Sequence, residues 1–200
     1  MGADGIGGGH TANYTSYYIK NVFIGGNKLY GNGENCIDFK TMDGIVISQN
    51  TCTGPCAREQ GGGIVLHYGA NSLPCKNALV QYNTIYNVST GIVNGSVGCD
   101  NCSYVGNRIS NATNAYACQY DPAYNGWGIQ IGGHGTIRVT DNTCYNCEKG
   151  VVSVPNLQSP DVLINERNTV STVPLDLNSL SNNNTSTTPS TTVTGTTTTT

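Results

Sequence analysis

Residues 43–54 read Asp-Gly-Ile-Val-Ile-Ser-Gln-Asn-Thr-Cys-Thr-Gly, so a short apolar strand runs into an asparagine and a second short strand follows. The same unit recurs at intervals of 23–35 residues and always carries the asparagine, at Asn27, Asn50, Asn83, Asn107, Asn142 and Asn168. We refer to these six residues as the marker asparagines. Such self-similarity is typical of a solenoid, in which each repeat packs only on its neighbours.

Apolar residues occupy fixed positions around the markers. Two residues after them stand Leu29, Cys52, Ile85, Ile109, Cys144 and Val170. Five and three residues before them, eleven of the twelve residues are apolar. Alternation with a period of two is the pattern of a strand with one buried face. The flanks of each marker are therefore predicted to be two strands.

A third strand follows in each unit, often after glycine, and begins at Ile37, Ile64, Ile92, Ile129, Val151 and Leu175. Stacked coils about 4.8 Å apart would pair these strands in parallel. We therefore expect an all-β fold, a right-handed parallel β-helix of six to seven coils with three short strands per coil. A partial coil is expected at Gly5-Ile6, and insertions are expected near residues 53–62 and 112–127.

Two properties of asparagine fit the marker position. A left-handed turn suits asparagine after glycine. Stacked amides can also hydrogen-bond from coil to coil.

The chain divides at residue 178. Residues 1–178 are the predicted β-helix domain, and the beginning Met1-Gly2-Ala3-Asp4 is typical of a start inside a longer chain or of a mature segment. In residues 179–200, 15 of 22 residues are Ser or Thr. Such a segment cannot bury enough surface to offset its ordering, so we expect a disordered tail or linker.

Composition excludes several classes of protein. Only 10% of residues are charged, 9 basic against 12 acidic, for a net charge of −3. A nucleic-acid-binding module needs a basic face, so no nucleic-acid partner is expected. The sequence contains no run of eighteen apolar residues, so no membrane span is expected. Nine cysteines predict an oxidising compartment, hence a secreted or cell-surface protein.

The cysteine positions predict disulfides. Cys75 and Cys99 each lie eight residues before their markers in adjacent coils, so their separation falls in the disulfide range. Cys118, in an insertion, could reach Cys147 or Cys144 in the next coil.

Two further cysteine predictions remain. Cys36 could meet either Cys52 or Cys56, and Cys102 is our choice for the unpaired thiol that an odd number requires. The gaps Cys99-Asp-Asn-Cys102 and Cys144-Tyr-Asn-Cys147 match zinc ligands, but the pairs lie in different coils, so we favour disulfides and buried thiols over zinc.

The segments Gly33-Glu34-Asn35-Cys36-Ile37-Asp38-Phe39-Lys40, Val46-Ile47-Ser48-Gln49-Asn50-Thr51-Cys52 and Gly61-Gly62-Gly63-Ile64 resemble the pectin-lyase-like β-helix superfamily, and locally the polygalacturonases. The resemblance implies a Cys36–Cys52 bridge. The catalytic positions do not carry over, because Glu34 and Asn35 replace the paired aspartates and Gly62 replaces the histidine. Inverting hydrolysis needs two carboxyl groups, so we do not expect polygalacturonase chemistry.

One group of polar residues could still perform chemistry. If the register holds, Lys40 and His67 are lateral neighbours on the outside of the third-strand sheet, with Asp38 beside them, and His10 and Arg58 could fold over the same patch. β-Elimination of a uronate needs a base and a cation to neutralise the carboxylate. Lys40 or His67 could be the base and Arg58 the neutraliser.

The same patch has two other interpretations. Asp38 with Glu34 could bind Ca²⁺ through oxygen ligands. Alternatively, Asp38 and Lys40 form an exposed salt bridge beside a surface histidine.

Aromatic and glycan-acceptor residues complete the predicted surface. Tyrosines such as Tyr68 could stack on sugar rings. Glycosylation is predicted at the Asn-x-Ser/Thr sequons of Asn13, Asn87, Asn101 and Asn111. The sequon at Asn94 lies in an inward position and is expected to stay bare.

Three functions fit the sequence. The protein acts on polysaccharide, as a lyase with Lys40, His67 and Arg58 in the site and with Asp38, Glu34, Tyr68 and His10 binding substrate. Alternatively, it is a non-catalytic glycan-binding or adhesive solenoid. The third interpretation is a structural, filament-forming protein that associates through its uncapped ends.

Overall fold

The structure is a computed structural model that describes residues 4–9, 18–54, 61–67, 73–94, 98–117, 125–153 and 161–171. All statements below concern these residues. They form strands and one 3₁₀ turn, η1 (Asn114–Tyr116), and no α-helix. Within these ranges, no helix has the length and apolar character needed to cross a bilayer.

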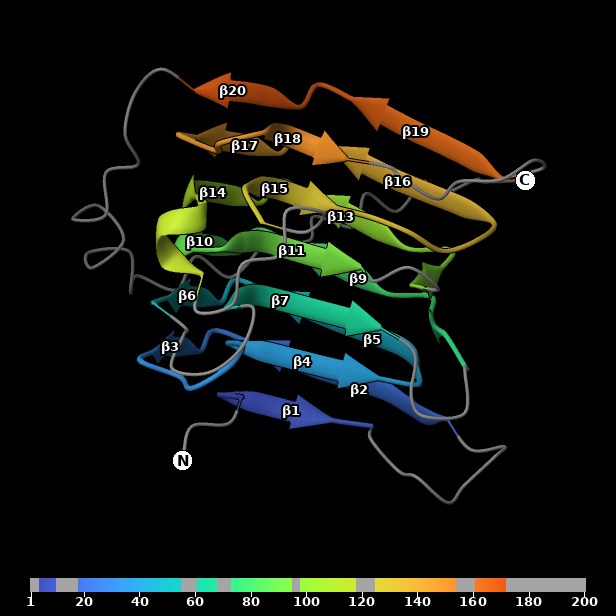
Figure 1. The fold of residues 1–200 in the computed structure, drawn as a ribbon. Coiled ribbons are helices and arrows are strands. Elements are labelled where there is room, and N and C mark those ends of the chain that lie inside the picture. The colour runs from blue at the N-terminus through green and yellow to red at the C-terminus, as the bar shows by residue number, and fades with distance from the viewer. Residues whose placement is uncertain are drawn as a thin grey trace, which may run out of the picture.

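The strands form three parallel sheets, and in Figure 1 the strands of each sheet follow one another from the N-terminal end to the C-terminal end. Sheet A runs β1 (Ile6–Gly8), β4 (Ile37–Lys40), β7 (Gly62–His67), β11 (Thr90–Asn94), β15 (Trp127–Gln130), β18 (Gly150–Ser153). Sheet C runs β3 (Lys28–Tyr30), β6 (Thr51–Thr53), β10 (Thr84–Val88), β14 (Arg108–Ala112), β17 (Thr143–Tyr145), β20 (Thr169–Ser171). The all-β class and the parallel pairing are therefore confirmed.

Sheet B contains eight strands, because two of its rows are interrupted. Its members are β2 (Ile19–Gly25), β5 (Met42–Ser48), β8 (Cys75–Lys76), β9 (Leu79–Gln81), β12 (Cys99–Asp100), β13 (Ser103–Val105), β16 (Thr136–Thr140) and β19 (Val162–Glu166). The interruptions fall at Asn77 and Asn101, which have positive φ. Asparagine tolerates this left-handed conformation better than most residues.

The predicted register around the markers is observed. Leu29, Cys52, Ile85, Ile109, Cys144 and Val170 are successive partners in sheet C. In sheet A, Ile6, Ile37, Ile64, Ile92 and Ile129 are successive partners, so the expected partial coil at Ile6 is present. The prediction was wrong by one residue at β18, where Val152 rather than Val151 is the partner of Ile129; Leu175, predicted to begin the next strand, lies outside the described residues.

The marker asparagines form a continuous ladder of amides. Each Nδ2 donates to the Oδ1 of the next marker at 2.8–3.0 Å, from Asn27 through to Asn168. Each backbone N–H donates to that same Oδ1 at 2.9–3.1 Å. The predicted coil-to-coil bonding is confirmed. The amides of Asn50, Asn83, Asn107 and Asn142 are also buried, so these bonds satisfy groups that water cannot reach.

The left-handed turn lies one residue earlier than predicted. The positive φ angles belong to the residues that precede the markers, namely Gly26, Gln49, Tyr82, Gly106, Asp141 and Arg167. The markers themselves are absent from the positive-φ positions of the described chain. The preceding residue makes the bend, and the marker side chain then points inward to join the ladder.

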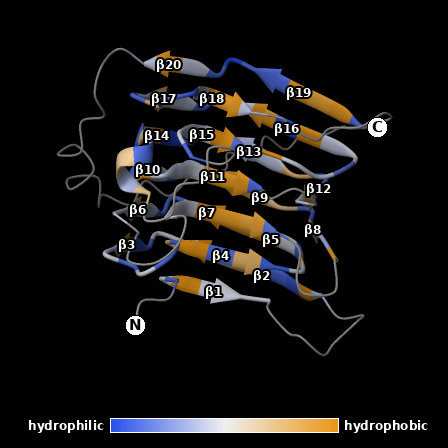
Figure 2. Cartoon of the chain, in the orientation of Figure 1, coloured by the Kyte–Doolittle hydropathy of each residue, from blue (hydrophilic) through white to orange (hydrophobic). Residues whose placement is uncertain are grey.

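Burial falls off toward both ends of the stack. In the middle, Ile45, Ile85 and Ile109 are 0% exposed. At the ends, Leu29 is only partly buried and Val170 is 67% exposed. Figure 2 shows hydrophobic colour on the arrows of β4 and β7 and hydrophilic colour in the connection from β19 to β20. Among the described residues, the apolar columns are thus covered by neighbouring coils in the middle and less so at the ends.

The disulfides differ from the predicted pairs. Among the described cysteines, they join Cys99 to Cys102 and Cys144 to Cys147, so the predicted pair Cys75–Cys99 is wrong, and so is the choice of Cys102 as the free thiol. Cys75 and Cys99 are indeed register partners. The turn at Asn101, however, brings Cys102 to a Cα–Cα distance of 6.0 Å from Cys99, within the range that a bridge requires.

The other predicted bridges are also not formed. Cys147 is bonded to Cys144, so the proposed Cys118–Cys147 pair is wrong; Cys118 itself lies outside the described residues. Cys36 and Cys52 are buried thiols that hydrogen-bond to each other, which together with desolvation raises the pKa of Cys52. The two observed disulfides indicate an oxidising environment.

Candidate functional site

The candidate site lies on the outward side of sheet A, where β4 and β7 pair. Ile37 and Phe39 of β4 point into the core, being 0% and 6% exposed. Alternation along the strand therefore directs Asp38 and Lys40 to the other side. The register pairs Lys40 with His67 at the end of β7. The two residues are therefore lateral neighbours, as predicted.

Asp38 is the centre of the group. Its Oδ1 lies 3.0 Å from Nε2 of His67, and its Oδ2 lies 3.5 Å from Nζ of Lys40. Nδ2 of Asn35 donates to the same Oδ2 at 3.3 Å. The Asp38 side chain is only 4% exposed, whereas those of Lys40 and His67 are 22% and 27% exposed. The expected salt bridge between Asp38 and Lys40 is therefore present, but its carboxylate is buried rather than exposed and contacts two partly accessible groups.

Asn35 and Gly62, which stand at two catalytic positions of the resembled pattern, contact each other in the structure. Its Oδ1 accepts a hydrogen bond from the backbone of Gly62 at 3.0 Å. A Cβ on Gly62 would lie 2.9 Å from Cγ2 of Val65 and 3.1 Å from that Oδ1. A side chain at the position that carries histidine in the resembled pattern would therefore require Val65 and Asn35 to shift, and the Asn35 side chain bonds to the backbone of the next coil.

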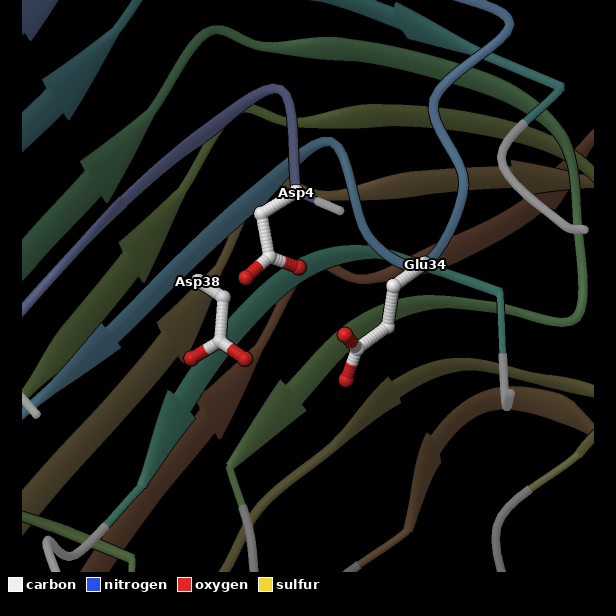
Figure 3. A group of neighbouring side chains, drawn as sticks. All are labelled: Asp4, Glu34 and Asp38. Carbon is white, nitrogen blue, oxygen red and sulfur yellow. The ribbon is translucent and has the colours of Figure 1, made fainter. Parts of the chain in front are cut away.

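Two further carboxylates converge on Asp38. Ligand oxygens of Asp4, Glu34 and Asp38 lie within 4.8 Å of one another, and Figure 3 shows the three side chains converging. Partial burial and the negative charge of Asp38 raise the pKa of Asp4, while hydrogen bonds from Asn35 and the charge of Lys40 oppose that shift.

This carboxylate group could serve as ligands for a hard cation such as Ca²⁺, which takes about six to eight oxygen ligands. The oxygens of Asp38 already face His67, Lys40 and Asn35. Positive charge from the protein itself therefore compensates part of the cluster. A cation bound by the three carboxylates would therefore compete with the Lys40 ammonium for the Asp38 carboxylate.

Asp4 was missed by the sequence interpretation. Because Ile6 is the partner of Ile37, Asp4 occupies the position that corresponds to Asn35 one coil earlier. Extending the aligned positions into the predicted partial coil at Gly5-Ile6 would have identified it. Its Oδ1 accepts a hydrogen bond from the Asn35 backbone at 3.2 Å.

The remaining predicted site residues lie elsewhere. His10, Arg58, Tyr68 and Asn13 fall outside the described residues. Asn101 is exposed, and its Oδ1 accepts a hydrogen bond from the Thr136 backbone at 3.0 Å. The predicted glycan attachment at this residue stays a prediction.

Two of the predicted glycosylation sites belong to a second amide ladder. Nδ2 of Asn111 donates to Oδ1 of Asn87 at 2.8 Å, and Nδ2 of Asn146 donates to Oδ1 of Asn111 at 2.9 Å. Each of the three stands four residues after a marker and has a positive φ. A glycan on Asn111 would replace a hydrogen of the amide that makes the first of these bonds.

Asn94 is buried, as expected for a bare sequon. Its Nδ2 donates to the hydroxyl of Tyr104 at 2.8 Å, and it is 2% exposed. Burial also raises the pKa of Tyr104, so this hydroxyl stays protonated.

Comparison with known proteins finds no matching protein family, no matching curated protein and no matching solved structure.

Proposed function

We propose that the chain winds as a right-handed parallel β-helix of six to seven coils, with three short strands per coil. Two observations support this proposal. Successive strands of sheets A, B and C alternate along the chain, and each strand pairs in parallel with its counterpart one repeat away. Parallel crossovers are right-handed in about 98% of known cases.

We further propose that this is a secreted or cell-surface protein that acts on an acidic polysaccharide as a lyase. The observation that carries the proposal is the contact of buried Asp38 with both His67 and Lys40 on the outward side of sheet A. A buried carboxylate holds both groups in place while leaving each partly accessible. Positioned groups of this kind are what proton abstraction from a uronate requires.

The roles follow from the chemistry of β-elimination. His67 removes the proton next to the uronate carboxylate, and the electron pair of that C–H bond forms the new double bond. The neighbouring C–O glycosidic bond breaks, and its oxygen leaves with a proton from solvent. The Lys40 ammonium stabilises the charge that develops on the uronate. Arg58 retains its predicted role as a second neutralising group.

A bound Ca²⁺ ion would supply additional positive charge beside the substrate carboxylate. Asp4, Glu34 and Asp38 are the residues that would hold it. The elimination described above does not depend on it.

The test is the ultraviolet absorbance of unsaturated uronate during incubation with pectate, alginate or glycosaminoglycans. His67→Ala should lower the rate by about 100-fold or more. His134→Ala is the matched control, because His134 also lies 3.1 Å from an aspartate, Asp161, at a distant position in the stack. Absence of absorbance with every polyuronide, or equal losses in the two variants, would contradict the lyase proposal.

A structural role is the second candidate, and the reduced burial at both ends favours it. The amide ladder is directional: at the first coil, Oδ1 of Asn27 receives no donor among the described residues, and at the last, the N–H of Asn168 meets no acceptor among them. A second copy stacked head to tail would complete the ladder.

Sedimentation velocity over a range of protein concentrations tests this second candidate. Val170→Glu, at the exposed end of an inward column, should abolish association. Val162→Glu is the control, because Val162 is also exposed but lies beside the inward Leu163 on the outward face of β19. A monomer at all concentrations would exclude the structural role.

A further inference from the structure

The outward face of sheet C carries two ordered columns of polar and aromatic side chains. The residue at the centre of each strand points inward, and Cys52, Ile85 and Ile109 are 0% exposed. The residues on either side of it therefore face outward. One outward column consists of Tyr30, Thr53, Tyr86, Ser110, Tyr145 and Ser171.

In this column, tyrosine alternates with a small hydroxyl residue; Thr53 and Ser171 are partly exposed, whereas Ser110 is buried. Tyr30, Tyr86 and Tyr145 stand on every second strand, so their backbone positions are about 9.6 Å apart along the stack. Tyr30 is 73% exposed, and Tyr86 and Tyr145 are partly exposed. The repeat of two sugar rings in an extended polysaccharide has a comparable length. Aromatic faces flanked by hydroxyl groups can stack on sugar rings.

The second outward column contains hydroxyl groups and two cations. Its members are Lys28, Thr51, Thr84, Arg108, Thr143 and Thr169. Lys28 and Arg108 are exposed, and neither forms a salt bridge with another described residue. Thr143 and Thr169 lie with their hydroxyl oxygens 3.4 Å apart. Thr84 is buried, so the column offers the hydroxyl groups of Thr51, Thr143 and Thr169 beside two exposed positive charges.

The charge of this face is opposite in sign to that of the whole chain. Its two outward columns carry two positive charges and no carboxylate, whereas the chain has a net charge of −3. At the adjoining turns, Asp141 and Glu166 are both paired with Arg167. An anionic ligand on this face would therefore meet cations without a carboxylate in the same columns.

We propose that the outward face of sheet C, here named the tyrosine face, binds an extended acidic polysaccharide that runs along the stack. Tyr30, Tyr86 and Tyr145 hold alternate sugar rings, and Lys28 and Arg108 bind the carboxylate or sulfate groups. The inference rests on polysaccharide as the ligand class of the proposed function. It adds a binding surface on a different sheet from Asp38 and His67.

Titration calorimetry of the full chain with oligogalacturonate tests the tyrosine face. Tyr86→Ala and Tyr145→Ala should each weaken the dissociation constant by about five-fold or more. Tyr116→Ala is the control, because Tyr116 is exposed on η1 and lies outside the two columns. Equal affinities for all three variants, with unchanged circular dichroism, would overturn the inference.

Two arginine variants, one on the tyrosine face and one outside it, test the role of the positive charges. Arg108→Gln should weaken binding by about five-fold at low salt and by less at high salt, since the contact is exposed and screened. Arg138→Gln should leave binding unchanged, because Arg138 is also exposed but lies on sheet B. Equal binding of a neutral oligosaccharide of the same length would show that the acidic preference is wrong.

The experiment separates this inference from the lyase proposal. Binding is measured in the His67→Ala background, in which turnover is expected to be slow, and turnover of the unmodified chain is measured separately by absorbance. Loss of binding in the tyrosine variants supports the tyrosine face as a polysaccharide-binding surface even if no polyuronide is cleaved. Cleavage without any effect of the tyrosine variants on binding overturns the face and leaves the lyase proposal standing.

Discussion

The backbone N–H and the side-chain amide of Asn83 both donate to Oδ1 of Asn107, at 3.1 and 3.0 Å. Both residues are 0% exposed. The pair is one step of a ladder that connects successive strands through their interior side. An interaction of this kind contributes most where removal of one partner leaves several buried polar groups without a hydrogen bond.

Replacement of Asn107 should therefore be costly. Asn107→Ala removes the partner of Asn83 and also the donor to Val80 O and to Asn142. We expect a loss of about 3 kcal/mol in the free energy of unfolding, measured by urea denaturation. Asn146→Gly is the control: it removes an exposed amide, tolerates the positive φ, and should cost below about 1 kcal/mol. Similar costs for the two variants would contradict a dominant role for the buried ladder.

The apolar columns should stabilise the middle of the stack more than its end. Ile85→Ala empties a position that is 0% exposed and should cost about 3 kcal/mol in denaturant unfolding. Val170→Ala lies in the same column but is 67% exposed, so it should cost less than about 1 kcal/mol. A large cost at Val170 would show that this end is covered in solution.

Gly91 lies where no side chain fits. A Cβ there would approach Gly128 O to 2.4 Å and Cγ2 of Ile109 to 2.8 Å, and a backbone oxygen in a sheet cannot move away easily. Gly91→Ala should lower the free energy of unfolding by about 2 kcal/mol or more. Gly54→Ala meets open space but has a φ of 59°, so it should cost about 1 kcal/mol. The reverse order would contradict the close approach.

Asp4 should reduce stability as the pH rises. Its folded pKa is raised above 3.8, so the folded chain holds more protons and stability falls between 3.8 and the folded pKa. Asp4→Asn keeps an acceptor for the Asn35 backbone and removes this effect, so we expect a slightly higher Tm at neutral pH and no gain below pH 3.8.

Asp141 is the control for Asp4, because its pKa is shifted in the opposite direction. The hydrogen bond and charge of Arg167 lower the Asp141 pKa, so its contribution is present above 3.8 and disappears as the pH falls through the lower folded pKa. Asp141→Asn should lower Tm at neutral pH, slightly, because this pair is exposed. Shifts of the same sign in both variants would contradict the assignment.

Cys75 should resist alkylation in the folded protein. It is 0% exposed, and desolvation raises its pKa to about 11, so little reactive thiolate is present at neutral pH. Mass spectrometry after iodoacetamide treatment should find Cys75 labelled only once denaturant is added. Rapid labelling under native conditions would mean that this interior is open to solvent.

The repeat pattern predicted the aligned columns because the physics there is local and periodic. Ile37, Ile64, Ile92 and Ile129 all had to be buried, and only one alignment of the strands achieves this. The register prediction was wrong by one residue at Val151 because two adjacent valines, Val151 and Val152, satisfy the apolar pattern equally well. Both pack against the core.

The disulfides and the acidic site depended on turn geometry that the pattern does not encode. Cys99 aligned correctly with Cys75, but the left-handed turn at Asn101 brought Cys102 to it instead. Asp38 was expected on an outward face and does lie there, yet it is buried by groups that include His67 and Asn35. Three-dimensional contacts between different coils determine that burial, and alternation along one strand cannot predict it.

The one-way direction of the marker ladder has a mechanical consequence. Hydrogen bonds between parallel strands of neighbouring coils, together with one shared Oδ1 per coil, connect each turn only to the turns directly before and after it. A force applied at the two termini would load these connections in series. Single-molecule stretching should then release the chain in a sawtooth whose steps are each one coil, 23–35 residues, long, starting from the sparsely buried extremities.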